Sequence, residues 1–152
     1  MQHIVVDTAQ QKLFFLSAGL LLAEYSISTA KNGLGEKKGS ECTPRGWHIV
    51  CELLGQDMPV NTCFKGRVSV GLWRQDSNID PILTRIIRLL GQESGFNLGG
   101  DHDTFQRHVY IHGTCDEYPM GIPLSHGCIR MRNQDIIDLC LRINLNTTVY
   151  IH

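Results

Sequence analysis

One cysteine and two histidines have the spacing of a thiol activated by an imidazole. Cys128 follows Gly127, His126 lies two residues before the cysteine, and His112 lies sixteen residues before it, after the apolar run 109–111. A free thiol has a pKa of about 8.5, so only a few per cent of it is the nucleophilic thiolate at neutral pH. A neighbouring imidazole that accepts the proton removes this limitation. The spacing therefore indicates a Cys/His pair for nucleophilic catalysis, with His112 as the base.

The glycine before the thiol favours this interpretation. A residue without a Cβ atom lets a ligand come close to the backbone, so the amides of Gly127 and Cys128 would be free to bind an oxyanion. His126 is only two residues from Cys128. We therefore expect its side chain to shape or polarise the site rather than to act as the base.

A zinc site is the main alternative for the same residues. His112, Cys115, His126 and Cys128 form the pattern H-x2-C followed by H-x-C. Structural zinc sites usually separate paired ligands by two to four residues, and H-x-C is tighter than that. A single cysteine or histidine also often serves only in packing. We therefore predict no metal and no cofactor, and we keep a zinc- or redox-dependent Cys/His binding module as the non-enzymatic alternative.

These residues also resemble the signature of the L,D-transpeptidase catalytic domain family, the YkuD family. The signature is Ser125-His126-Gly127-Cys128-Ile129-Arg130, preceded by His112-Gly113-Thr114. Residues 43–49, TPRGWHI, are similar to the T-P-x-G-x-x-I segment of that family, and residues 97–100 fit as well. The resemblance therefore extends over most of the chain. It implies a mainly β fold with the catalytic cysteine at a sheet edge.

The resemblance implies acyl transfer on peptidoglycan stem tetrapeptides through a thioester. Cys128 would attack the carbonyl between the L-centre of the third residue, often diaminopimelate, and a terminal D-alanine. His112 would accept the thiol proton and return it to the leaving amine, and the carbonyl of Gly113 would fix its tautomer. An amine acceptor would give a 3-3 cross-link or D-amino acid exchange. Water would give a trimmed tripeptide, which is the L,D-carboxypeptidase reaction.

Four residues near the pair are candidates for substrate binding. Arg130 could bind a carboxylate of the stem peptide through its guanidinium, although a cation there also suits a solvated or helix-capping role. Ser125 and Tyr110 could make polar contacts or simply pack, and His126 completes this group.

Length and charge limit the class of protein. The 152 residues suit a single domain over 1–152. The formal net charge of -1 and the lack of a basic run argue against nucleic-acid binding and against electrostatic membrane anchoring. No stretch is long and apolar enough for a membrane span. The expected partner is a peptidoglycan stem peptide or its soluble precursor or recycling fragment, and the oligomeric state stays open.

The N-terminus contains a segment that resembles a secretion signal. Residues 13–23 are apolar, and residues 28–30, Ser-Thr-Ala, resemble a cleavage site. However, Asp7 and a strand-like segment at 4–6 precede them, and residues 17–19 suit a hairpin turn. We therefore expect a hairpin in the mature protein.

The cysteine pattern also bears on location. The six cysteines show no dense disulfide framework, so reduced thiols are expected. We expect a cytoplasmic protein, with the periplasm as the alternative. A cytoplasmic enzyme would meet soluble tetrapeptides during cell-wall recycling, where water is the abundant acceptor, so we favour the carboxypeptidase over the transpeptidase reaction.

Several short segments alternate apolar and polar residues, which predicts a mainly β chain. The predicted strands cover residues 3–7, 12–16, 20–28, 47–54, 66–71, 107–111 and 147–151. Polar, glycine-rich stretches at 31–41 and 91–106 are predicted to be loops.

Two helices are predicted among these strands. The first begins at Asp80-Pro81, since aspartate caps free amides and proline suits the first helical position. Its apolar residues between 82 and 90 fall at helical spacing, and Gly91 is a natural stop. The second helix begins with Asn133 as its cap and continues to Ile143. Two short helices against many strands predict a single-domain β-sandwich or partly closed barrel.

Overall fold

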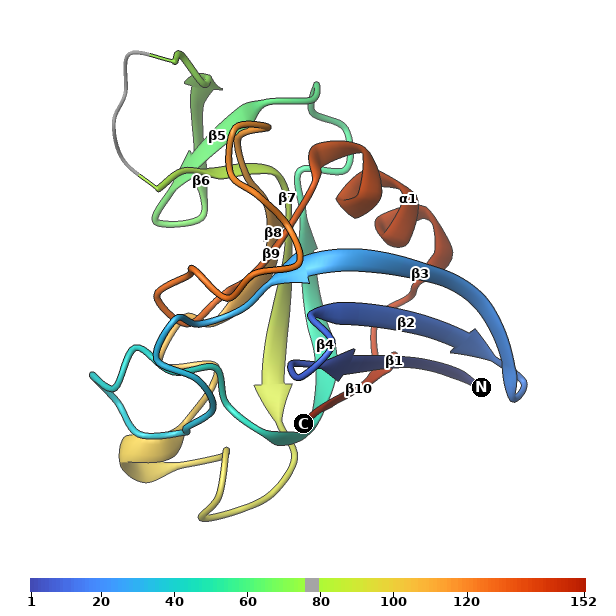
Figure 1. Ribbon diagram of the computed structural model, residues 1–152, viewed down its shortest axis with the longest axis vertical. Coiled ribbons are helices and arrows are strands. Elements are labelled where there is room, and N and C mark those ends of the chain that lie inside the picture. The colour runs from blue at the N-terminus through green and yellow to red at the C-terminus, as the bar shows by residue number, and fades with distance from the viewer. Residues whose placement is uncertain (76–79) are drawn as a thin grey trace.

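Ten strands and one α-helix occur in the described part of the chain, residues 1–75 and 80–152, in a computed structural model (Figure 1). The strands are β1 (Gln2–Asp7), β2 (Lys12–Ser17), β3 (Leu20–Ser28), β4 (Gly46–Leu54), β5 (Thr62–Lys65), β6 (Val68–Leu72), β7 (Ile82–Gly91), β8 (Tyr110–Gly113), β9 (Ile129–Met131) and β10 (Thr148–Ile151). The helix is α1 (Asn133–Arg142), and a 3-10 turn, η1, covers Gly100–His102. The seven predicted strands are confirmed, with shifts of up to three residues at their ends.

The strands form one barrel-like sheet. Their order is β4-β10-β1-β2-β3-β9-β8-β7, and pairing of β4 with β7 closes the ring. Two pairs, β1–β10 and β8–β9, are parallel. The β5–β6 hairpin continues from β7 outside the ring, and Figure 1 shows it projecting away from β1 and β10. The predicted mainly β, barrel-like fold is confirmed.

The segment after Asp80-Pro81 is strand β7, so the first predicted helix is wrong. β7 pairs with β4, β5 and β8, and all its residues from Leu83 to Leu89 are buried. A strand that is covered on both faces has a continuous apolar run instead of an alternating one, and periodicity cannot distinguish that run from a buried helix. The β-branched Thr84, Ile86 and Ile87 favour the strand.

Helix α1 is confirmed, but Asn133 has another role than the predicted cap. The cap position is occupied by Arg132, and Asn133 is the first helical residue. Its Oδ1 accepts a hydrogen bond of 2.6 Å from the hydroxyl of Thr84, and its Nδ2 donates one of 3.1 Å to Asn61. Asn133 therefore ties the start of the helix to β7. Asp135 lies in the first turn and Arg142 in the last turn, each at the end of the helix where the helix dipole favours its charge.

Strands β8 and β9 separate two apolar clusters. Alternate residues of a strand face opposite sides of the sheet. Ile111, Ile129 and Met131 belong to the main core, which also contains α1 residues Ile136 and Leu139. A smaller cluster on the other side is formed by Phe64, Ile86, Tyr110, Leu54, Ile82 and Cys128. The predicted nucleophile therefore lies on the face of β8–β9 that is turned away from the main core.

The N-terminal segment is part of the barrel. Leu13 and Phe15 of β2 are buried in the main core, and Ile27 of β3 packs with them. β2 and β3 pair antiparallel, so the expected hairpin is confirmed. Among the described residues, no helix has the length and hydropathy that crossing a membrane requires. All six cysteines lie in the described ranges and are free thiols.

Candidate active site

The parallel pairing of β8 with β9 brings together residues that are far apart in sequence. His112 lies opposite Arg130 in the register, and the thiol of Cys128 accepts a hydrogen bond of 3.2 Å from the amide of Tyr110. Because side chains alternate along a strand, Tyr110 and His112 share one face with Cys128 and Arg130. The structure therefore places the predicted thiol and the predicted base on the same face of two adjacent strands.

The imidazole of His112 is buried and held in one orientation. Its Nδ1 lies 2.6 Å from the carbonyl oxygen of Gly113. A carbonyl can only accept, so Nδ1 carries the proton and Nε2 is the basic nitrogen. Burial lowers the pKa of His112, and the nearby charge of Arg130 lowers it further, against the opposing effects of the Gly113 carbonyl and Asp80. The imidazole is therefore neutral at pH 7, which is the form a general base requires.

Gly113 has no room for a side chain. A Cβ atom at this position would lie 2.5 Å from Oδ1 of Asn133 and 2.6 Å from the carbonyl of Leu83. The close approach of these groups allows Gly113 to present its carbonyl to His112 while the strand packs against α1.

The thiol of Cys128 is half-buried in the smaller apolar cluster. Burial raises its pKa to about 11, whereas the Tyr110 amide and the charges of Arg130 and Arg107 act in the opposite direction. A raised thiol pKa and a lowered imidazole pKa leave both groups neutral in the resting site. The structure therefore has no preformed thiolate–imidazolium pair at pH 7.

The turn before Cys128 depends on Gly127. Its φ of 137° lies in a region that favours glycine. The hydroxyl of Ser125 accepts a hydrogen bond of 3.2 Å from the Gly127 amide and donates one of 2.5 Å to the carbonyl of Cys128. The Gly127 amide is therefore already engaged, and the Cys128 amide is the remaining candidate of the predicted oxyanion pair.

Thr43, a residue of the loop before β4 that was not among the predicted site residues, contacts this turn. Its hydroxyl donates a hydrogen bond of 2.8 Å to the carbonyl of Gly127 and accepts one of 3.0 Å from the amide of Ala30. Thr43 is fully buried. The similarity of residues 43–49 to the T-P-x-G-x-x-I segment was the available signal for it.

Arg130 is buried, whereas its predicted role in binding a carboxylate of the substrate requires an accessible guanidinium. Its side chain is only 4% exposed, its guanidinium forms an ion pair with Asp80, and its Cζ lies 4.7 Å from the centre of the Tyr118 ring. His126 is 68% exposed, and its Nδ1 lies 3.4 Å from the same Asp80 carboxylate. Asp80 was interpreted as a helix cap, because the segment after it was predicted to be helical, and so its part in the site was missed.

Tyr110 contributes its backbone more directly than its phenol. Its amide contacts the thiol, while its hydroxyl accepts a hydrogen bond of 2.9 Å from Arg67. The ring packs in the smaller cluster with Phe64 and Cys128. Tyr110 therefore positions the thiol and connects it to the β5–β6 hairpin.

A cavity of about 560 Å³ lies between the β5–β6 hairpin and the start of β7. Its lining is Cys63, Phe64, Lys65, Val70, Gly71, Leu72, Trp73, Arg74, Asp80, Pro81 and Ile82. Two of these residues, Phe64 and Ile82, belong to the same cluster as Cys128, and Asp80 contacts Arg130 and His126. The cavity is therefore connected to the candidate active site through shared residues.

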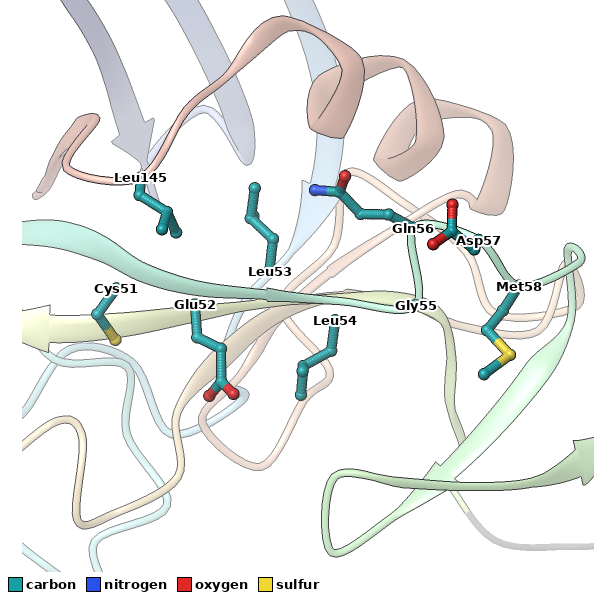
Figure 2. A pocket seen from close by; sticks show the side chains of 9 residues that line it. All are labelled: Cys51, Glu52, Leu53, Leu54, Gly55, Gln56, Asp57, Met58 and Leu145. Carbon is teal, nitrogen blue, oxygen red and sulfur yellow. The ribbon is translucent and has the colours of Figure 1, made fainter.

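A second cavity, of about 520 Å³, is formed by the C-terminal half of β4 and the residues after it (Figure 2). It is lined by Cys51, Glu52, Leu53, Leu54, Gly55, Gln56, Asp57, Met58 and Leu145. It contains none of the site residues that the sequence predicts. Of these two cavities, the one beside Asp80 shares residues with the candidate active site.

The residues of the zinc pattern have other contacts. Nδ1 of His112 is bound to a carbonyl, His126 is turned to Asp80, and the thiol of Cys128 accepts from an amide. In residues 1–75 and 80–152, no three histidine, cysteine or acidic side chains are grouped as a metal site.

The sequence matches the model of one protein family over residues 1–151, described as YkuD, the L,D-transpeptidase catalytic domain. The chain therefore belongs to this family. A search of curated proteins found no match.

Solved structures with the same fold are L,D-transpeptidases from several bacteria. An enzyme from Xylanimonas cellulosilytica is 18% identical with a TM-score of 0.62, over 99% of this chain and 60% of that one. A cysteine-to-serine variant from Enterococcus faecium is 16% identical with a TM-score of 0.60, over 99% of this chain and 49% of that one. L,D-transpeptidase 3 from Mycobacterium tuberculosis, solved with a faropenem-derived adduct, is 15% identical with a TM-score of 0.62, over 99% of this chain and 60% of that one. The chain thus spans at most about three fifths of these structures, and the likeness concerns the fold.

Proposed function

We propose that this chain cleaves the bond between the L-centre of the third residue and the terminal D-alanine of peptidoglycan stem tetrapeptides, with Cys128 as nucleophile. The observation that carries this proposal is the shared face of Cys128 and His112, on adjacent parallel strands, with Nδ1 of the imidazole bound to the carbonyl of Gly113. That hydrogen bond leaves Nε2 as the nitrogen that can accept a proton.

The proposed reaction proceeds in two stages. Nε2 of His112 takes the proton of the Cys128 thiol as the sulfur attacks the peptide carbonyl, and the Cys128 amide binds the oxyanion. The carbon–nitrogen bond to D-alanine then breaks, and the imidazolium gives its proton to the leaving amine. The product of this stage is a thioester between Cys128 and the tripeptide acyl group, together with free D-alanine.

Water is the proposed acceptor of the acyl group. His112, neutral again after the first stage, can remove a proton from water or from an amine as either attacks the thioester carbonyl. The carbon–sulfur bond then breaks, and the imidazolium returns the proton to the sulfur of Cys128. Water is the more abundant nucleophile at any aqueous site, so hydrolysis to the tripeptide is favoured. Transfer to an amine, which would give an L,D-transpeptidase, is the alternative, because the same thioester allows it.

The cavity beside Asp80 suits a peptide that carries several carboxylates. Lys65 and Arg74 line it with exposed cationic side chains. Arg130 is buried against Asp80, so in this proposal its positive charge acts on the thiol from a distance. Lys65 and Arg74 contact the carboxylates of the substrate.

Mass spectrometry of the products tests this proposal. The full chain is incubated with a disaccharide-tetrapeptide, alone and with excess D-amino acid, beside Cys128→Ala and Cys51→Ala. We expect wild type to remove one D-alanine and Cys128→Ala to remove none. Cys51→Ala is the control and should behave like wild type, because Cys51 is a free thiol on β4 that lines the other cavity. Abundant exchange or cross-linked dimer would show that an amine is the acceptor. Turnover by Cys128→Ala would refute the proposed nucleophile.

A further inference from the structure

We propose that Asp80 is a positioning residue of the active site, whose single carboxylate holds Arg130 in place beside His112 and tethers His126. The observation is that one oxygen, Oδ2 of Asp80, forms the ion pair with Arg130 and also lies 3.4 Å from Nδ1 of His126. Three separate segments meet at this oxygen: the residues before β7, the turn before β9, and β9 itself.

Burial shows why Arg130 requires this partner. Its side chain is 4% exposed, whereas that of Asp80 is 27% exposed. A buried guanidinium without a counter-charge is strongly destabilising. The ring of Tyr118, with its centre 4.7 Å from the Arg130 Cζ, gives a cation–π contact but no negative charge. Asp80 therefore keeps the guanidinium in its place.

The position of Arg130 makes its charge matter to the reacting pair. Arg130 lies opposite His112 in the β8–β9 register and two residues after Cys128, on the same face. A cation there favours the thiolate and disfavours the imidazolium. The carboxylate of Asp80 acts in the opposite direction on both groups. Asp80 therefore determines how strongly the charge of Arg130 shifts the pKa values of Cys128 and His112.

The other charged and titratable groups around the pair come from three loops and do not replace this carboxylate. Arg107 donates to the carbonyl of Cys42 and adds a second cation. The carbonyl of His108 lies 3.6 Å from the Cys128 thiol, and its imidazole contacts Arg67 at 3.4 Å. Tyr118 and His126 complete the set. None of these groups is an acid that is negatively charged at pH 7, so the role falls to Asp80.

The inference rests on the proposed thiol chemistry, but its test reads Cys128 directly and needs no peptidoglycan. The rate of alkylation by iodoacetamide is measured on the full chain between pH 7 and 9, with the peptide that contains residue 128 quantified by mass spectrometry. Below the thiol pKa this rate follows the fraction of thiolate.

Asp80→Asn keeps the shape of the side chain and removes its charge. An opposite or like charge within a few Å shifts a pKa by about one unit or more, so Asp80→Asn should lower the thiol pKa by about one unit and raise the thiolate fraction about tenfold. A thiolate of lower pKa is less nucleophilic, by about threefold per unit, so alkylation should be about threefold faster. Asp80→Glu restores the charge and should return the rate to that of wild type.

This comparison separates a charge effect from a structural one. If Asp80 only fills space, Asp80→Glu should change the rate as much as Asp80→Asn, and that result would overturn the proposal. Glu24→Gln removes a carboxylate from an exposed pair with Lys12 at 3.2 Å and should leave the rate unchanged.

If Asp80→Asn does not fold, Arg130→Gln gives the reverse test: it leaves Asp80 unopposed and should slow alkylation about threefold. An unchanged rate there would also overturn the proposal. A chain that fails to process tetrapeptide but shows these changes would refute the proposed function alone.

Discussion

The hydroxyl of Thr43 donates a hydrogen bond of 2.8 Å to the carbonyl of Gly127, and so connects the loop before β4 to the turn that carries Cys128. The same hydroxyl accepts from the amide of Ala30 at 3.0 Å. One buried side chain thus satisfies two backbone groups from segments that are far apart in sequence. The turn that carries Cys128 is therefore held by the loop before β4 as well as by β9.

Thr43→Val tests that connection. Valine has nearly the same shape but neither donates to Gly127 nor accepts from Ala30, so two buried backbone groups lose their partner. We expect the free energy of unfolding to fall by about 1–3 kcal/mol. We also expect the rate of Cys128 alkylation to differ from that of wild type, because the turn that carries the thiol loses a contact. Urea denaturation measures the first effect. Thr8→Val, which removes an exposed hydrogen bond of 2.9 Å to the carbonyl of His152, is the matched control and should have a small effect. Equal effects of the two variants would contradict the role of Thr43.

Gly127→Ala tests the conformation of the turn. The φ of 137° is unfavourable for alanine, and the added Cβ would lie 3.4 Å from the carbonyl of Cys42, which is an ordinary contact. We therefore expect a stability loss of about 1–3 kcal/mol from backbone strain. Relaxation of that strain would move the thiol, and a shift of about 1 Å can cost about 100-fold in turnover.

Gly39→Ala is the control for Gly127→Ala. Gly39 has a φ of 81° in the loop before β4, and its added Cβ would meet nothing within 4 Å. The Gly39→Ala variant should lose stability from backbone strain alone and should keep the turnover of wild type. A comparable loss of turnover in both variants would mean that strain anywhere, rather than the position of the thiol, is responsible.

The pH dependence of turnover follows from the neutral resting pair. Burial lowers the pKa of His112, so the base stays unprotonated down to a pH below its usual range. We expect kcat/KM to fall on the acid side only below about pH 6.5, the unperturbed pKa of histidine. Because burial raises the pKa of Cys128 to about 11, alkylation at pH 7 should be slower than that of a free small-molecule thiol. An acid limb above pH 6.5, or alkylation faster than the free thiol, would instead indicate a preformed ion pair.

Stability should also depend on pH, through a histidine outside the site. His48 is fully buried between the carbonyl of Gly46 and the hydroxyl of Thr104, at 3.1 and 2.8 Å. Burial lowers its pKa from 6.5 to about 4. The unfolded chain therefore binds a proton more readily than the folded one between pH 6.5 and about 4, and stability falls as pH falls through that range. Between pH 7 and 5 the loss from His48 should be about 2 kcal/mol.

Urea titrations at pH 7 and pH 5 check this effect. His48→Gln keeps a polar side chain without an ionisable group, so the difference between the two pH values should shrink by about the His48 contribution. His112 is also buried with a lowered pKa and should account for part of the remaining difference. An unchanged difference in His48→Gln would contradict the assignment.

The sequence predicted seven of the strands and missed β5, β7 and β9. β1, β2 and β4 have one face toward the core and one that is less buried, which leaves a period of two. β7 is buried on both faces, so its apolar run has no such period and its first residues, Asp80-Pro81, suited a helix start equally well. That one error also hid Asp80, because a residue interpreted as a helix cap is not sought in an active site.

The candidate reacting residues of the site could be predicted from the sequence, whereas its hydrogen bonds could not. Cys128 and His112 could be selected as candidates because only a few residue types can act as a nucleophile or a base. The engagement of the Gly127 amide by Ser125, and the burial of Arg130 against Asp80, depend on side-chain directions in three dimensions. Contacts between segments so distant in sequence leave no pattern within either segment.

The central claim, a thioester on Cys128, is tested most directly by the intact mass of the protein mixed rapidly with stem tetrapeptide and quenched in acid. We predict that wild type gains the mass of the tripeptide acyl group, that Cys51→Ala does so as well, and that Cys128→Ala does not. Peptide mapping should place the adduct on residue 128. An adduct on Cys128→Ala, or release of D-alanine by that variant at the wild-type rate, would contradict the account.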